Sequence, residues 1–307
     1  MSDYLICTQN IKNNEFGNEP SKAIYLRVPD NELVFLPKHK IEEKEFLSDI
    51  IDQKQENIII FIHGYNSDDD VVIERHRTLK KGFQKAGFKG NLITFVWPSD
   101  DKPLLYLEDR HDAKVTALEL VNSGIKLLVK QQNRDCTVNV HLIAHSTGAY
   151  VIKEAFEDAE TTRSTSEMNW IVSQILFIGG DISSDSMRTE RAQTIYAHCN
   201  RLTNYFNPYD SILAISNAKR VGFQNRVGRI GLPDDSPTKA IDINCGNHFN
   251  AHKDELKEVV KGALSHSWYF YSDAWYNDAL ATIMGNLDRN VIPTRELDRN
   301  NELFLKV

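Results

Sequence analysis

Long apolar runs are missing from this sequence. None of its hydrophobic stretches approaches the roughly 20 residues that a membrane-spanning helix needs. The first ten residues, MSDYLICTQN, also lack the basic start and the apolar core of a secretory signal peptide. We therefore expect a cytoplasmic protein without a transmembrane segment.

Cysteine is scarce, and there is no excess of basic charge. The four cysteines, Cys7, Cys136, Cys199 and Cys245, show neither a C-x-x-C pair nor a zinc-finger spacing, so we expect reduced thiols and no metal site. The formal net charge is -7, whereas a protein that binds nucleic acid generally presents a basic surface. The charge therefore argues against a nucleic-acid partner.

The residues that are present suit an ordinary folded protein, with 41% hydrophobic and 26% charged residues. From residue 57 onward, apolar strand-like runs alternate with amphipathic segments. This order predicts a single α/β domain, with a mostly parallel, doubly wound sheet flanked by helices. We assign residues 1–55 to strands and a helix at the leading edge of the sheet, residues 56–290 to the core, and residues 291–307 to a peripheral tail.

Two segments illustrate how the elements are assigned. Residues 57–62, NIIIFI, are apolar on both faces of a strand, which is typical of a parallel strand in the middle of a sheet. Residues 186–199 are more polar, and we expect them to form a helix between two strands.

The segment 138–151, VNVHLIAHSTGAYV, carries the clearest sign of chemistry. It is predicted to be a buried strand that turns at Ala144-His145-Ser146-Thr147-Gly148 directly into a helix. Small residues two positions before and two after a serine allow a strained turn that exposes the hydroxyl. Ser146 is therefore the candidate nucleophile.

A serine hydroxyl attacks a carbonyl efficiently only with a histidine to take its proton and an acid to orient that histidine. In open α/β sheets, ligands bind beyond the carboxyl ends of the strands. Asp181 and Asp210 each follow a predicted strand and are the candidate acids. His248 and His266 follow the last core strand and are the candidate bases. Serine, acid and histidine then occur in the chain order of the α/β hydrolases.

Five short motifs give the sequence a family resemblance. They are H-G-Y-N at 63–66, W-P-S at 97–99, A-H-S-T-G at 144–148, D-S-I-L at 210–213 and S-H-S-W-Y at 265–269. With these motifs the chain resembles the serine α/β hydrolases, and more narrowly a bacterial subgroup of unknown function. The resemblance favours Asp210 over Asp181 as the acid and His266 over His248 as the base, because the first of each pair lies within a matching motif.

The resemblance implies a carboxylesterase- or lipase-like hydrolase that acts on a small-molecule acyl substrate and needs no cofactor. The backbone N–H groups of Tyr65 and Thr147 would form the oxyanion hole. Trp97, Trp268 and Tyr269 are candidates for the wall of an apolar acyl pocket. Aromatic side chains near strand ends are equally common in the core.

A different class of function is also compatible with the sequence. The fold occurs in catalytically silent binding modules and in subunits of larger assemblies, since a fold alone does not establish a function. The presence of all three triad residue types in order favours an enzyme. The sequence leaves a protein partner or an oligomer open.

Overall fold

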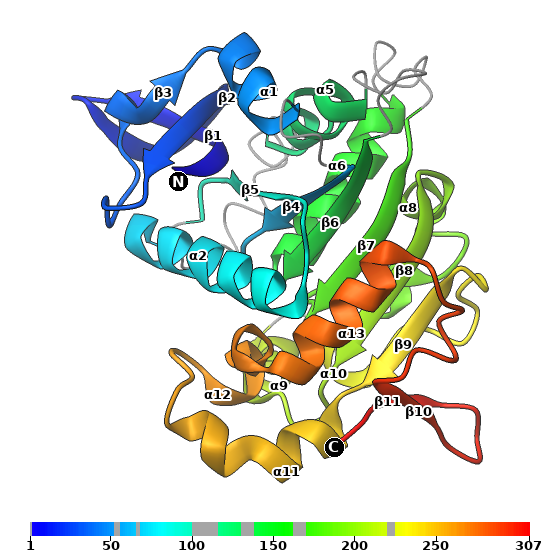
Figure 1. Ribbon diagram of the computed structural model, residues 1–307. Helices are drawn as coiled ribbons and strands as arrows, with labels where there is room; N and C mark the ends of the chain where they lie inside the picture. The colour runs from blue at the N-terminus through cyan, green and yellow to red at the C-terminus, as the bar shows by residue number, and fades with distance from the viewer. Residues whose placement is uncertain are drawn as a thin grey trace.

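The structure is a computed structural model and describes residues 2–51, 56–65, 68–99, 116–129, 138–161, 170–219 and 225–307. Its centre is an 11-stranded sheet with the strand order β10-β11-β9-β8-β7-β6-β4-β5-β1-β2-β3 (Figure 1). The strands are β1 (Ser2–Lys12), β2 (Glu15–Pro29), β3 (Lys40–Ile41), β4 (Asn57–Ile62), β5 (Asn91–Val96), β6 (Asn139–His145), β7 (Val172–Ile178), β8 (Cys199–Phe206), β9 (Ala240–Asn244), β10 (Arg295–Leu297) and β11 (Leu303–Leu305). The α-helices are α1 (Glu43–Ile51), α2 (Asp69–Ala86), α5 (Lys126–Val129), α6 (Gly148–Thr161), α8 (Gln193–Ala197), α9 (Ser211–Lys219), α10 (Val227–Ile230), α11 (Gly246–Lys257), α12 (Leu264–Ser267) and α13 (Asp273–Met284).

The central strands from β5 across to β9 are all parallel. The chain passes from β4 to β5 on one side and then returns to place β6 on the other side of β4. The direction of winding therefore reverses between β4 and β6, and a crevice at such a point is where open α/β sheets bind ligands. The mostly parallel, doubly wound sheet predicted from the sequence is confirmed.

Side chains of β4 alternate between two apolar layers. Ile58, Ile60 and Ile62 belong to the layer that includes residues of α1, α6 and α8. Ile59 and Phe61 belong to the opposite layer, which includes residues of α2, α11 and α13. Helices cover both faces of the sheet (Figure 1), which explains why this strand is apolar along its whole length.

The helix predicted at 186–199 is much shorter in the structure. The chain forms a 3-10 turn at Asp185–Met187 and the short helix α8, and Cys199 already begins β8. The Ser186 hydroxyl donates to the carbonyl of Ser183 at 2.7 Å. Such local side-chain bonds compete with helical hydrogen bonding.

The structure also bears on the missing apolar runs and on the few cysteines of the sequence. Among helices of the described ranges, none is long and apolar enough to cross a membrane. Cys7, Cys199 and Cys245 are free and buried, and burial raises the pKa of the Cys199 thiol to about 12. Cys136 lies outside the described residues.

Residues 291–307 lie at the opposite edge of the sheet from the N-terminal strands. Here β10 and β11 pair with each other, and Phe304 of β11 pairs with Asn244 of β9. Arg295 is fully buried and donates to both carboxylate oxygens of Asp278 on α13, at 2.6 and 2.9 Å. Tyr205 of β8 donates to the same carboxylate at 2.6 Å. A buried ion pair thus joins this edge to the core.

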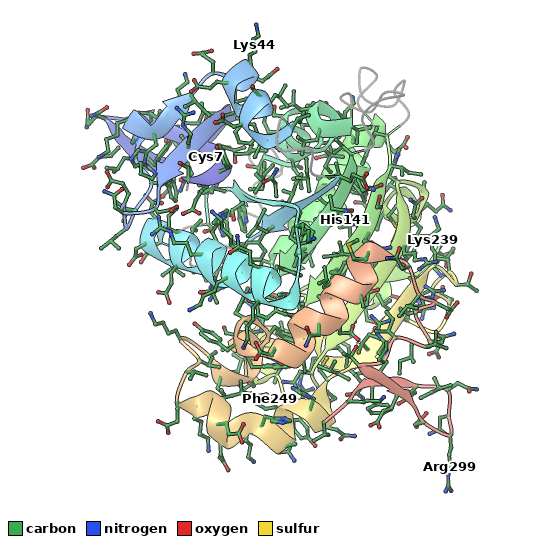
Figure 2. All side chains as sticks on the ribbon, in the orientation of Figure 1. Cys7, Lys44, His141, Lys239, Phe249 and Arg299 are labelled. Atoms are coloured by element: carbon green, nitrogen blue, oxygen red, sulfur yellow. The ribbon has the colours of Figure 1, made fainter. Side chains whose placement is uncertain are left out.

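Replacing Arg295 by methionine is expected to lower the free energy of unfolding by about 3–5 kcal/mol, because Asp278 would then be a buried charge without a counter-ion. The measurement is denaturant unfolding followed by circular dichroism. Arg299→Met is the matched control, since Arg299 is exposed and points away from the molecule between β10 and β11 (Figure 2). Equal unfolding free energies for the two variants would show that the buried pair adds no stability.

Candidate active site

Ser146 lies immediately after β6, at the reversal point of the sheet. It has a φ of 54°, in the left-handed region that residues with a side chain rarely adopt. Its N–H donates to the carbonyl of Ile178 at 3.2 Å, and its own carbonyl accepts from Asp181 N–H at 2.9 Å. The end of β7 therefore holds the backbone of Ser146 in this strained conformation.

Two glycines are required by the close packing around Ser146. A Cβ at Gly148 would lie 2.4 Å from the carbonyl oxygen of Ile62, closer than any side chain tolerates. A Cβ at Gly64 would lie 2.9 Å from Cβ of Ser146. The turn after β4 and the start of α6 thus approach each other directly beside the serine.

Asp210 and His266 form a buried pair. Nδ1 of His266 donates to Oδ2 of Asp210 at 2.7 Å, and the two side chains are 8% and 0% exposed. The other carboxylate oxygen, Oδ1, accepts from the N–H of Leu213 at 3.0 Å. Both oxygens of Asp210 are therefore committed, and the histidine ring is oriented by one of them.

The loops that carry this pair are tied together. The side-chain amide of Asn207 donates to the carbonyl of Ser265 at 2.9 Å, and the N–H of Ser211 donates to the Ser265 hydroxyl at 3.0 Å. These bonds attach the turn after β8 to α12 directly before His266. The relative position of acid and base therefore does not depend on one hydrogen bond alone.

Gly179 connects the pair to Ser146. It directly follows Ile178, which accepts from Ser146, and a Cβ at Gly179 would lie 3.2 Å from Nδ1 of His266. The ring of His145 lies 4.6 Å from that of His266, centroid to centroid. No hydrogen bond joins the hydroxyl of Ser146 to His266 within the described residues, and such bonds are often long in proteins without a bound substrate.

The alternative base, His248, and the alternative acid, Asp181, bind other groups. Nδ1 of His248 donates to the carbonyl of Lys306 at 2.6 Å, and its Nε2 accepts from the Ser272 hydroxyl at 3.3 Å. Burial lowers the pKa of His248. Oδ1 of Asp181 lies 3.1 Å from Nε of Arg226. The structure thus pairs Asp210 with His266, and it places His248 against the C-terminal segment.

The turn after β4 is held by His63. Nδ1 of this ring donates to the carbonyl of Gly64 at 2.7 Å, and Nε2 accepts from the N–H of Trp97 at 3.3 Å. Burial lowers the pKa of His63 to about 4, so the ring is neutral at physiological pH. His63 therefore positions the backbone next to Tyr65, while Thr147 stands at the start of α6, beside the serine.

The three aromatic candidates for a substrate pocket are buried. Trp97, Trp268 and Tyr269 are each 0% exposed. Trp97 stacks on His63, and the other two belong to the apolar layer that contains α13. The sequence allowed either a pocket wall or a core position for these three side chains. Their burial favours the core position, and we do not propose them as pocket walls.

Sequence reasoning missed a chain of contacts behind the base. Nη1 of Arg75 donates to Nδ1 of His145 at 3.2 Å, and Nε2 of His145 donates to the carbonyl of His266 at 3.1 Å. Because an arginine side chain can only donate, Nδ1 of His145 must be the acceptor, and its proton must be on Nε2. Burial, His266 and Arg75 lower the pKa of His145 well below its usual range. A neutral His145 thus supports the backbone of His266.

No group of three or more His, Cys, Asp or Glu side chains is placed to hold a metal ion in the part of the chain that the structure describes.

Comparison with known proteins gives a family match that covers most of the chain. The family described as alpha/beta hydrolase of unknown function (DUF900) matches residues 38–273. A search of curated proteins found no match. The crystal structure of Aspergillus fumigatus lipase B is similar at 13% identity with a TM-score of 0.30, over 60% of this chain and 40% of the lipase chain. A structural likeness this distant carries no argument about activity.

Proposed function

Because this chain belongs to the family of alpha/beta hydrolases of unknown function, we propose that it is a serine hydrolase that cleaves an ester or another acyl bond of a small molecule. The observation that carries the proposal is the buried pair of His266 and Asp210, joined at 2.7 Å beside the strained turn of Ser146. A carboxylate on Nδ1 leaves Nε2 of the ring as the proton acceptor, which is the arrangement that activates a serine.

The reaction would proceed in two halves. Oγ of Ser146 attacks the carbonyl carbon of the substrate, and Nε2 of His266 takes the hydroxyl proton. The resulting oxyanion accepts hydrogen bonds from the N–H groups of Tyr65 and Thr147. The bond between the carbonyl carbon and the oxygen of the leaving alcohol then breaks, and His266 gives its proton to that oxygen. In the second half, His266 takes a proton from water, and the water oxygen attacks the carbonyl carbon of the acyl-enzyme. The bond to Oγ of Ser146 breaks, His266 returns the proton to Oγ, and the acid is released.

Labelling with a fluorophosphonate tests this proposal, because the reagent phosphonylates a serine only where a base activates it. We expect the wild-type protein to gain one adduct, located by peptide mass spectrometry on Ser146. Ser146→Ala should stay unlabelled, whereas Ser186→Ala, which removes a hydroxyl in another part of the chain, should label fully. A folded wild-type protein that remains unlabelled would instead support a catalytically silent binding module.

A further inference from the structure

A pocket of about 290 Å³ lies between α2 and the segment around α12. Its lining includes Val71, Arg75 and Thr78 of α2, and Lys261 and Phe270 from the facing segment. The proposed reaction gives this pocket no role. Its volume is near the lower end of the range for small-molecule sites, so any ligand must be small.

Among the described residues, Arg75 forms no ion pair with a carboxylate, because the nearest acid, Glu74, pairs with Lys261. The Arg75 guanidinium contacts the neutral ring of His145, at 3.2 Å, and the face of Phe270, with 5.1 Å from Cζ to the ring centroid. The other charged side chains of the pocket, Lys261 and Glu74, form an ion pair with each other at 2.6 Å. Burial lowers the pKa of Arg75, and the nearby Tyr271 and Glu74 oppose this effect only in part.

The remaining donors of the guanidinium determine which ligand fits. Only Nη1 of Arg75 donates within the described residues. No described residue binds its other N–H groups, and their planar geometry suits a carboxylate or a phosphate. Val71 and Phe270 make part of the wall apolar, which an inorganic ion would leave unused. We propose that the pocket binds a small organic anion, with its carboxylate or phosphate on Arg75 and an apolar stem against Val71 and Phe270.

This site is adjacent to the proposed base but independent of it. The described hydrogen bonds join Arg75 to the backbone of His266 through His145, and none joins Arg75 to the imidazole ring of His266. Binding of the anion therefore requires neither Ser146 nor the acid–base pair. The binding test can be made on Ser146→Ala protein, where no substrate is turned over.

Isothermal titration of Ser146→Ala protein with butanoate, butyl phosphate and butan-1-ol tests the proposal. We expect saturable binding of at least one of the two anions and none of the neutral alcohol, and the tighter anion identifies the preferred head group. Adding Arg75→Met should weaken that binding by about 10- to 100-fold, as expected for a charge-assisted hydrogen-bonded pair. Lys81→Met removes the same charge from an exposed position of α2 and should leave the affinity unchanged.

A second variant keeps the test decisive if Arg75→Met does not fold. Val71→Phe fills the pocket while it retains Arg75, and it should also abolish binding. The proposal is overturned if neither anion binds the parent protein, if Lys81→Met weakens binding as much as Arg75→Met does, or if Val71→Phe binds as tightly as the parent. Anion binding by a wild-type protein that no fluorophosphonate labels would refute the hydrolase proposal and leave this one standing.

Discussion

Replacing Ser146 or His266 by alanine is expected to lower kcat/KM for an activated short-chain ester by about 10⁴- to 10⁶-fold, and replacing both should lower it no further. The two side chains act as one unit, because a serine hydroxyl without a base to take its proton is a weak nucleophile, and the base without that hydroxyl has no nucleophile to activate. The measurement is the initial rate of ester hydrolysis by purified variants. A double variant much slower than either single variant would mean that the two residues act separately.

His248→Ala is the matched control for His266→Ala. His248 is bound to Lys306 and Ser272 rather than to a carboxylate. Its loss should therefore change kcat by less than about tenfold, even if thermal stability falls. The loss of a true acid–base group costs more than that. If His248→Ala is inactive while His266→Ala retains its rate, our assignment of the base is wrong.

Asp210→Asn is expected to lower kcat by about 10⁴-fold with little change in KM. In the wild-type protein, Oδ1 of Asp210 accepts from Leu213 and Oδ2 accepts from His266. If the asparagine oxygen stays on Leu213, its NH₂ group faces Nδ1 of His266. The ring must then carry its proton on Nε2, where it can no longer take the proton of Ser146.

The variant Asp181→Asn completes this test. Asp181 lies beside Arg226, at 3.1 Å, so its neutralisation should change kcat by less than about tenfold, as for a group outside proton transfer. A larger loss for Asp181→Asn than for Asp210→Asn would reverse the assignment of the acid. Fluorophosphonate labelling should follow the same ranking as kcat.

Much of the fold was predictable because its signals are local. The apolar run of β4 indicated a strand buried on both faces, and the small residues around Ser146 indicated a tight turn after β6. Each depends on neighbours in sequence. The helix predicted at 186–199 was too long for the opposite reason, because a serine hydroxyl that bonds to a nearby carbonyl, as Ser186 does, is not visible as a period in the sequence.

The candidate site was predictable in its residue types but not in its pairing. Two acids and two histidines followed strands, and no spacing could decide which acid meets which base. Their motifs, not their geometry, favoured Asp210 and His266. The contact from Arg75 to His145 joins residues 70 positions apart, and an arginine on a helix that also carries exposed lysines gives no sign of pointing inward.

The buried pair at the sheet edge also constrains the order of events during synthesis. Asp278 leaves the ribosome before Arg295, the residue that neutralises it. Until Arg295 has emerged, docking α13 against β8 would bury the carboxylate without a counter-ion, at a cost of several kcal/mol. The C-terminal half of the sheet should therefore stay open on the nascent chain, and it should close in one step after the strand that carries Arg295 has been made.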